Sequence, residues 1–255
     1  MKMTLTSIII ALTIALLSVA VFTSCSPKTE KKDEPIQKTE SADKDVPDAE
    51  MINLWRQAAE QEDVDAQINL GLCYYNGNGV DKDYAEAVKW YRKAAEQGDS
   101  LAQFSLGICY YFGDGVEQDM EEAVKWYRKA AEQDFAEAQS VLGVCYLDGK
   151  GIAKDSGEAV KWFRKAAEQG FAQAQSILGV CYLDGEGIAK DSEEAVKWFR
   201  KAAEQGYAEA QYNLGICYGK GKGVPQDFEK AEQWVRKSAE QGFELAIKLL
   251  KSLAS

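Results

Sequence analysis

Histidine is absent from all 255 residues of the chain. Without an imidazole, the protein cannot form a Ser-His-Asp or Cys-His catalytic unit, and it has no histidine ligand for a metal. Carboxylate pairs such as Glu121-Glu122 recur on expected helix surfaces, which is typical of solvated faces. One Ser-x-x-Lys sequence begins at Ser41, without a Ser-Asp-Asn or Lys-Thr-Gly companion. We therefore predict no catalytic, cofactor-binding or metal-binding residue.

An excess of positive charge is also missing. The formal net charge is −11, and no stretch of the chain forms a basic stripe. The phosphates of a nucleic acid would repel such a protein. An anionic membrane surface would repel it as well, so membrane attachment would need a covalent lipid.

Long apolar runs are missing except at the start, where residues 8–22 form a run of about 15 residues, too short to span a bilayer comfortably. Lys2 is the only charged residue before position 25. This pattern predicts a signal peptide at residues 1–24. Two cleavage sites compete. One lies after Ala20, in a small-x-small sequence, and the other lies before Cys25, in a sequence that resembles the bacterial lipoprotein box.

We favour cleavage before Cys25, with a lipid on that cysteine, because a tether-like segment follows it. Residues 25–47 are rich in charge and proline and almost free of large apolar side chains, which predicts a disordered acidic linker. The prediction is a bacterial envelope lipoprotein secreted across the inner membrane. Ser26, in place of an aspartate, favours the outer membrane. A periplasmic or fully secreted protein is the alternative.

The rest of the chain is a repeat of 36 residues. Each unit carries, at fixed positions, an Ala-Gln pair, a glycine, a cysteine, a tyrosine, a Gly-x-Gly turn and a tryptophan. The Ala-Gln pairs begin at Ala66, Ala102, Ala138, Ala174 and Ala210. A period of this size is typical of stacked-repeat solenoids, whose units bury their apolar faces only against neighbours.

Two helices are expected in each unit. In the first unit, apolar residues recur with helical spacing over residues 64–75, which we call helix A. Helix B is expected from Asp83 to about Gln97, with Asp83 and Glu86 as a capping-box-like pair. Lys230 replaces that glutamate in the fifth unit and predicts a weaker cap. The glycine inside helix A costs roughly 1 kcal/mol, so its recurrence predicts close contact with a neighbouring helix.

Cysteine is scarce in each unit, with one residue at the same place in helix A. A disulfide needs Cα atoms about 4.4–6.8 Å apart, whereas packed helices stand roughly 8–10 Å apart. The pattern therefore predicts five free, buried thiols, at Cys73, Cys109, Cys145, Cys181 and Cys217.

The repeated string Ala-Gln-x-x-Leu-Gly-x-x-Tyr, followed by Gly-x-Gly-Val/Ile, Asp, Glu-Ala, Trp and Lys-Ala-Ala-Glu-Gln-Gly, resembles the Sel1-like repeat, a relative of the tetratricopeptide repeat. The resemblance implies an all-α fold, a right-handed α-solenoid of antiparallel helix pairs. The solenoid would cover residues 48–254. It would have a half-repeat cap at 48–62, five full repeats at about 63–242 and a capping helix at 243–254.

The resemblance also implies a concave surface, lined by helix A, that binds proteins. Columns of helix A that differ between units are candidates for that groove. The candidate groove residues are Ile68, Tyr75, Phe104, Tyr111, Phe112 and Tyr212, and the aromatic ones among them would anchor a partner. We therefore expect a non-catalytic adaptor for an unidentified protein or peptide, without a cofactor. The alternatives are an envelope hydrolase, like the Sel1-type proteins described as penicillin-binding or β-lactamase-like, and a plain structural spacer.

Overall fold

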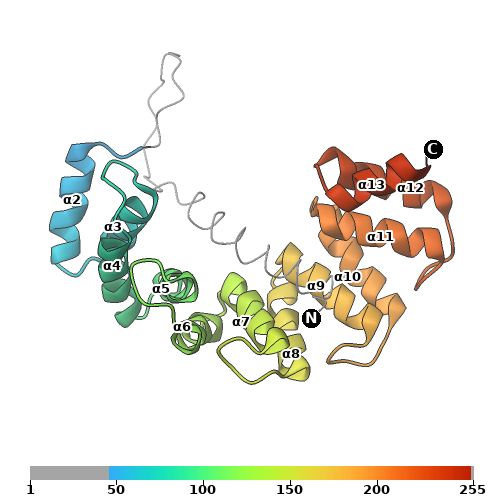
Figure 1. Ribbon diagram of the computed structural model, residues 1–255, viewed down its shortest axis with the longest axis horizontal. Helices are drawn as coiled ribbons and strands as arrows, with labels where there is room; N and C mark the ends of the chain where they lie inside the picture. Colours follow the sequence, from blue (N-terminus) through green and yellow to red (C-terminus); the bar gives the residue numbers. More distant parts are fainter. Residues whose placement is uncertain (1–45, 254–255) are drawn as a thin grey trace, which may run out of the picture. The chain divides into compact units, whose positions relative to one another are not determined.

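The computed structural model describes residues 46–253, which contain twelve α-helices and no strand (Figure 1). The predicted signal peptide, Cys25 and nearly all of the predicted linker lie outside the described residues. The helices are α2 (Ala49–Glu60), α3 (Val64–Asn76), α4 (Tyr84–Glu96), α5 (Ser100–Phe112), α6 (Met120–Glu132), α7 (Ala136–Asp148), α8 (Ser156–Glu168), α9 (Ala172–Asp184), α10 (Ser192–Glu204), α11 (Ala208–Lys220), α12 (Phe228–Glu240) and α13 (Glu244–Leu253). No helix within residues 46–253 is both long and apolar enough to cross a membrane.

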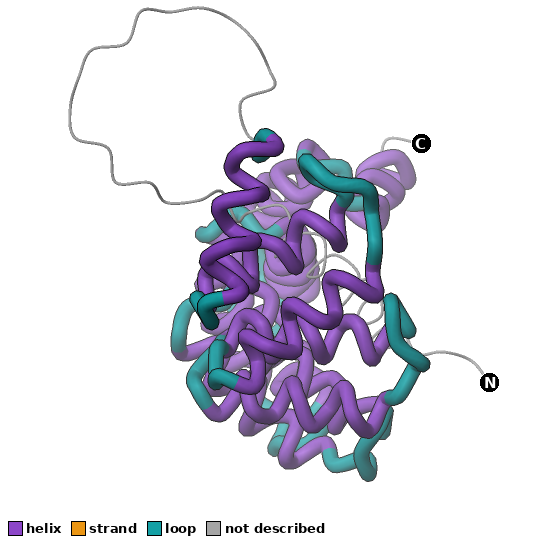
Figure 2. The backbone as a smooth tube through the Cα atoms, turned by 90° about the vertical axis from the view of Figure 1, so that its left-hand side faces the viewer, coloured by secondary structure: helices purple, strands orange, loops and turns teal. Residues whose placement is uncertain are grey.

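The helices belong to two compact units, which divide between Ala130 and Ala131. In the first unit α3 packs against α4, and in the second unit α7 packs against α8, α9 against α10 and α11 against α12. Figure 2 shows the helices joined by loops along the backbone. The odd-numbered helices from α3 to α11 are the expected helices A, and the even-numbered helices from α4 to α12 are the expected helices B. This confirms the predicted fold class, an α-solenoid of antiparallel helix pairs.

The helix ends follow the turn chemistry of the repeat. Helix α3 ends at Gly77, whose positive φ of 79° suits glycine, and the Gly77 N–H donates to the Cys73 carbonyl. Helix α4 begins at Asp83, whose carboxylate accepts from the Glu86 N–H at 3.0 Å. The Glu86 side chain pairs with Lys89. The aspartate cap is also present in α12, where the Lys230 N–H donates to Asp227 at 2.9 Å; the weaker cap expected there stays a prediction.

The first four helix A glycines lie against a ring of their helix B, and the fifth, Gly215, lies against Val235, so all five make the close helix contact that the sequence predicts. A Cβ added at Gly107 would lie 2.6 Å from Cε1 of Tyr127, and one added at Gly143 would lie 2.7 Å from Cε1 of Phe163. Such distances are too short for real carbon atoms, so the glycine allows the two helices to approach closely. The Trp column is also buried in the first four repeats, as predicted for core packing, while Trp234 of the fifth is half-buried. A lysine ammonium lies over each ring, such as Lys165 over Trp162.

Glutamines join one helix pair to the next. In the second unit, the Gln175 Nε2 of α9 donates to the Ala167 carbonyl, at the end of α8, at 3.0 Å. The Gln175 Oε1 in turn accepts from the Gln205 Nε2 of α10 at 2.8 Å. The buried Gln175 amide therefore hydrogen-bonds to the helix B of the preceding repeat and to the end of the helix B of its own repeat. Gln211 repeats both bonds one repeat later, which explains the Ala-Gln signature.

Candidate functional site

Two of the predicted groove residues are buried in the core, which corrects the groove prediction. Phe104 has no exposed surface and packs on the Tyr127 ring, with ring centroids 5.6 Å apart. Ile68 is 6% exposed. Ser140 and Ser176, at the same position in later repeats, are buried as well. In the first four repeats this column is therefore core although its residues differ in size, because the local packing adapts to each size. Neither Ile68 nor Phe104 can contact a partner here.

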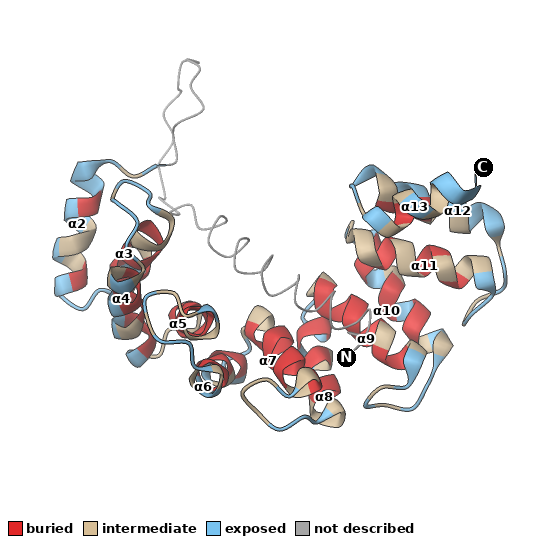
Figure 3. Ribbon diagram, viewed as in Figure 1, coloured by how far each residue is buried: buried red, intermediate tan, exposed pale blue. Residues whose placement is uncertain are grey.

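The central helices A leave little surface of any kind. Most of α7 and α9 is buried on all sides, as the red segments of Figure 3 show. The surface that remains along the helices A therefore lies at their two ends, of which the C-terminal end is next to the Gly-x-Gly turn.

Three of the predicted residues, Tyr75, Tyr111 and Phe112, lie at such helix ends in the first unit. The Tyr75 hydroxyl donates to Asp114 Oδ2 at 2.7 Å, and its ring meets Tyr84 edge-on at 4.9 Å. Burial and this carboxylate raise the pKa of Tyr75 well above its ordinary value. Tyr111 packs edge-on against Phe112, which is 42% exposed. We call Tyr75, Tyr84, Tyr111 and Phe112 the aromatic cluster.

Tyr212, the remaining groove candidate, lies in the second unit. It is half-buried, and its ring packs on Phe243 at 5.5 Å, just before α13 begins. Part of its ring remains exposed, and its role in a groove stays a prediction.

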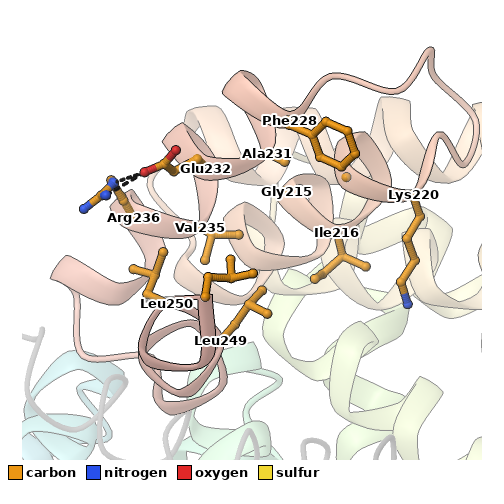
Figure 4. Close-up of a pocket in the computed structure, with 12 residues that line it drawn as sticks. Gly215, Ile216, Lys220, Phe228, Ala231, Glu232, Val235, Arg236, Leu249 and Leu250 are labelled. Carbon is orange, nitrogen blue, oxygen red and sulfur yellow. Dashed lines mark hydrogen bonds and ion pairs between the residues drawn. The ribbon is translucent and has the colours of Figure 1, made fainter. Parts of the chain in front are cut away.

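The second unit also holds a pocket that the sequence analysis missed. It has a volume of about 730 Å³ and lies between α11, α12 and α13 (Figure 4). We call it the terminal pocket. Its floor is apolar, with Val235 of α12 and Leu249 and Leu250 of α13 pointing into it. Lys220 and the Glu232–Arg236 ion pair lie at its edge.

Two small residues open this pocket. Val235 stands where the four preceding repeats have a buried ring, at Tyr91, Tyr127, Phe163 and Phe199. Gly219 stands where those repeats have a tyrosine or leucine, at Tyr75, Tyr111, Leu147 and Leu183. The missing side-chain volume leaves a cavity in an otherwise regular helix pair. A comparison of the repeats would have revealed both substitutions in the sequence alone.

The five repeat cysteines are free and buried, as predicted. Burial raises their pKa, to about 11 for Cys73 and about 12 for Cys145. Such thiols are almost wholly protonated at neutral pH and are poor nucleophiles. Cys25, the predicted lipidation site, lies outside the described residues. No group of three potential metal-ligating side chains occurs within residues 46–253.

One carboxyl group in the second unit has an unusual environment. Burial raises the pKa of Glu209, in the first turn of α11, from 4.5 to about 7. The nearby Tyr207 hydroxyl donates to Glu209 Oε2 at 3.4 Å and offsets part of this rise. At the same position the fourth repeat has Gln173, which is neutral at every pH.

Comparison with known proteins gives a consistent result. The family model for the Sel1 repeat matches five consecutive segments, at residues 64–99, 100–135, 136–171, 172–207 and 208–243. A Sel1 repeat protein from Oxalobacter formigenes is similar in structure, with 40% sequence identity and a TM-score of 0.77, over 81% of this chain and 82% of that one. No match was found among curated proteins.

A protective antigen present in uropathogenic Escherichia coli strains, which displays the same kind of fold, is also similar. It is 36% identical, with a TM-score of 0.76. The match covers 92% of this chain but 47% of the antigen, so this chain spans about half of that protein. The five matched segments, the helix pairs and these structural relatives agree, and the chain therefore belongs to the Sel1 repeat family.

Proposed function

We propose that this protein is a non-catalytic adaptor that binds a protein or peptide through the aromatic cluster. Sel1 repeat proteins are generally scaffolds for protein interactions. The observation that carries the proposal is Phe112, an aromatic side chain that is 42% exposed beside Tyr111. Exposed aromatic residues of this kind supply much of the binding energy at protein interfaces.

The cluster is held in place before any partner arrives. The Tyr75–Asp114 hydrogen bond and the Tyr75–Tyr84 ring contact fix two of its four side chains. A surface whose side chains are already ordered loses less conformational entropy on binding. In the third and fourth repeats the position of Phe112 is taken by Asp148 and Asp184, so the cluster is specific to the first unit.

Catalysis has little support from the residues present. The chain has no histidine, and burial raises the pKa of each of its five repeat thiols. These features favour an interaction protein over the hydrolase alternative.

The proposal includes attachment to the bacterial envelope by a lipid on Cys25, with residues 25–47 as a tether to the folded repeats. The support is the sequence of residues 1–25. Mass spectrometry of the purified protein should find an acylated Cys25 at the new N-terminus, and Cys25→Ala should release the protein from membranes. A mature chain that begins at Val21 would contradict this part of the proposal.

The binding proposal is tested by crosslinking in intact cells, with the wild type and a Tyr111→Ala/Phe112→Ala variant as baits. A protein captured by the wild type and lost by the variant would support the cluster as a binding site. Phe228→Ala is the matched control, because Phe228 is an exposed aromatic residue in the second unit. Equal capture by all three baits would reject the cluster, and no specific capture would favour the spacer alternative.

A further inference from the structure

Large exposed apolar side chains are few in the part of the chain that the structure describes, and outside the aromatic cluster they are concentrated in two places. Six large hydrophobic residues within residues 46–253 are exposed. Phe112 belongs to the aromatic cluster. Three others, Val46, Met51 and Leu54, lie in or just before α2, and two, Phe228 and Leu253, line the terminal pocket. The exposed apolar surface of α2 and the terminal pocket are therefore the two sites outside the cluster that remain to be explained.

The apolar side chains of α2 form a short ridge. Met51 and Leu54 are three residues apart, which places them on the same side of the helix. Leu54 is 55% exposed, although the equivalent residue of the first repeat, Trp90, is buried. The face of α2 that carries Leu54 therefore lacks the cover that the same face has in α4. An amphipathic helix of this kind suits an apolar groove that accepts residues spaced three or four apart.

The terminal pocket has the shape and lining to accept such a ridge. Its volume of about 730 Å³ lies between α11, α12 and α13, and its floor is made by Val235, Leu249 and Leu250. Phe228 and Leu253, also among the lining residues, are 70% and 73% exposed. A pocket of this size holds several side chains.

The two surfaces also carry opposite charge. Residues 46–65, which include α2, contain six acidic residues and one basic residue. Residues 220–253, which include α12 and α13, contain seven basic and five acidic residues, in a chain whose net charge is −11. Lys220 lies at the pocket itself, together with Arg236, whose charge is paired with that of Glu232. The acidic surroundings of α2 therefore complement the basic surroundings of the pocket.

We propose that copies of this chain associate head to tail, with Met51 and Leu54 of one copy seated in the terminal pocket of a second copy. The contact is heterologous, because it joins two different surfaces. Each copy keeps one free surface of each kind, so the association can continue beyond two copies. The proposal is independent of the binding role of the aromatic cluster.

The contact differs from the joint between repeats inside the chain. Lys251 of α13 occupies the position of the helix A glycine, and Ile247 occupies the position of the joining glutamine. A helix B therefore cannot approach α13 as Tyr127 approaches Gly107. The pocket provides the apolar contact instead, and we expect a reversible association that weakens as salt screens the opposite charges.

The protein is purified from cells, so that it keeps its native N-terminal processing, and is kept in mild detergent. Sedimentation velocity over a dilution series then measures its self-association. The wild type should form larger species as its concentration rises. Leu54→Asp damages the α2 surface and Leu253→Glu damages the pocket, and each should weaken self-association at least about tenfold, as loss of a central apolar contact does. Both residues are mostly exposed, so both variants should fold, which circular dichroism checks.

Mixing the two variants gives the decisive result. Leu54→Asp keeps an intact pocket and Leu253→Glu keeps an intact α2, so the mixture should form dimers and nothing larger. Phe112→Asp, an equal change on the aromatic cluster, should associate like the wild type. The proposal is overturned if the wild type stays monomeric throughout, if Leu54→Asp alone associates as well as the wild type, or if the mixture stays monomeric.

Discussion

Helices α9 and α10 and helices α11 and α12 follow the same 36-residue pattern, yet their interiors differ. In the fourth repeat Phe199 and Leu183 stand at the positions that Val235 and Gly219 take in the fifth. The ring of Phe199 presses on Gly179, whereas Val235 and Gly219 line the terminal pocket. The joining bonds are unchanged, with Gln175 and Gln211 reaching the preceding helix at 3.0 Å and 3.2 Å.

The comparison separates two kinds of position in a repeat. Helix caps, joining glutamines and helix A glycines hold each pair in place and hardly vary. The side chains between the helices can change in size without altering the helix bounds. A cavity for recognition can therefore appear in one repeat while its neighbours stay closed.

The largest expected effect is the difference in stability between two variants, each of which replaces one glycine by alanine. In Gly143→Ala the new Cβ would lie 2.7 Å from Cε1 of Phe163 and 3.1 Å from the Ala159 carbonyl oxygen. Overpacking of this kind should lower the free energy of unfolding by about 2–3 kcal/mol. In Gly219→Ala the nearest atom would be Cβ of Ala231 at 3.6 Å, an ordinary contact. That variant should gain about 1 kcal/mol from the better helix propensity of alanine.

Urea unfolding of both variants measures the contrast. Equal effects of the two substitutions would show that the ring-packed Gly143 site of the third repeat and the open Gly219 site of the fifth repeat do not differ in their packing as described.

A smaller effect is expected from Glu209→Gln, which gives the fifth repeat the residue type of the fourth. The folded pKa of Glu209, about 7, lies above its ordinary value of 4.5. Between these values the unfolded chain releases its proton first, so stability falls as pH rises from about 4.5 to about 7. At about pH 8 the variant should be more stable than the wild type by on the order of 1–2 kcal/mol.

Thermal unfolding at several pH values tests this sign. At about pH 4 both proteins are neutral at this position in the folded and unfolded states, so they should melt alike. A stability difference that is the same at acidic and alkaline pH would rule out the titration of Glu209 as its cause.

The smallest effect is expected from Val235→Phe, which restores the ring found in the other repeats. The added ring should fill part of the terminal pocket and raise stability by roughly 1 kcal/mol through extra apolar burial. It should also weaken head-to-tail association, because the pocket becomes shallower. Calorimetry and sedimentation measure the two effects. Loss of stability would mean that the helices of the fifth repeat lie too close for a ring.

The repeat pattern predicted the features that every unit needs. The helix pairs, the glycine contacts and the five buried thiols follow from residues that recur at every joint. The groove residues were harder to predict, because exposure depends on how neighbouring helices pack. Phe104 varies between repeats and is still buried, since Tyr127 packs against it. The glutamine joint was also missed, because a polar residue on a helix does not reveal that it faces a carbonyl of the preceding helix.

The glutamine joint has a consequence for how the array changes in evolution. Each unit of 36 residues contains the amide that bonds the helix before it and the carbonyl that receives the next amide, as Gln175 and Ala203 do in the fourth repeat. A duplicated unit therefore arrives with both halves of its own junction. Array length can then change in whole units without new compensating mutations, and the near-identical third and fourth repeats have the sequences that such a duplication would leave.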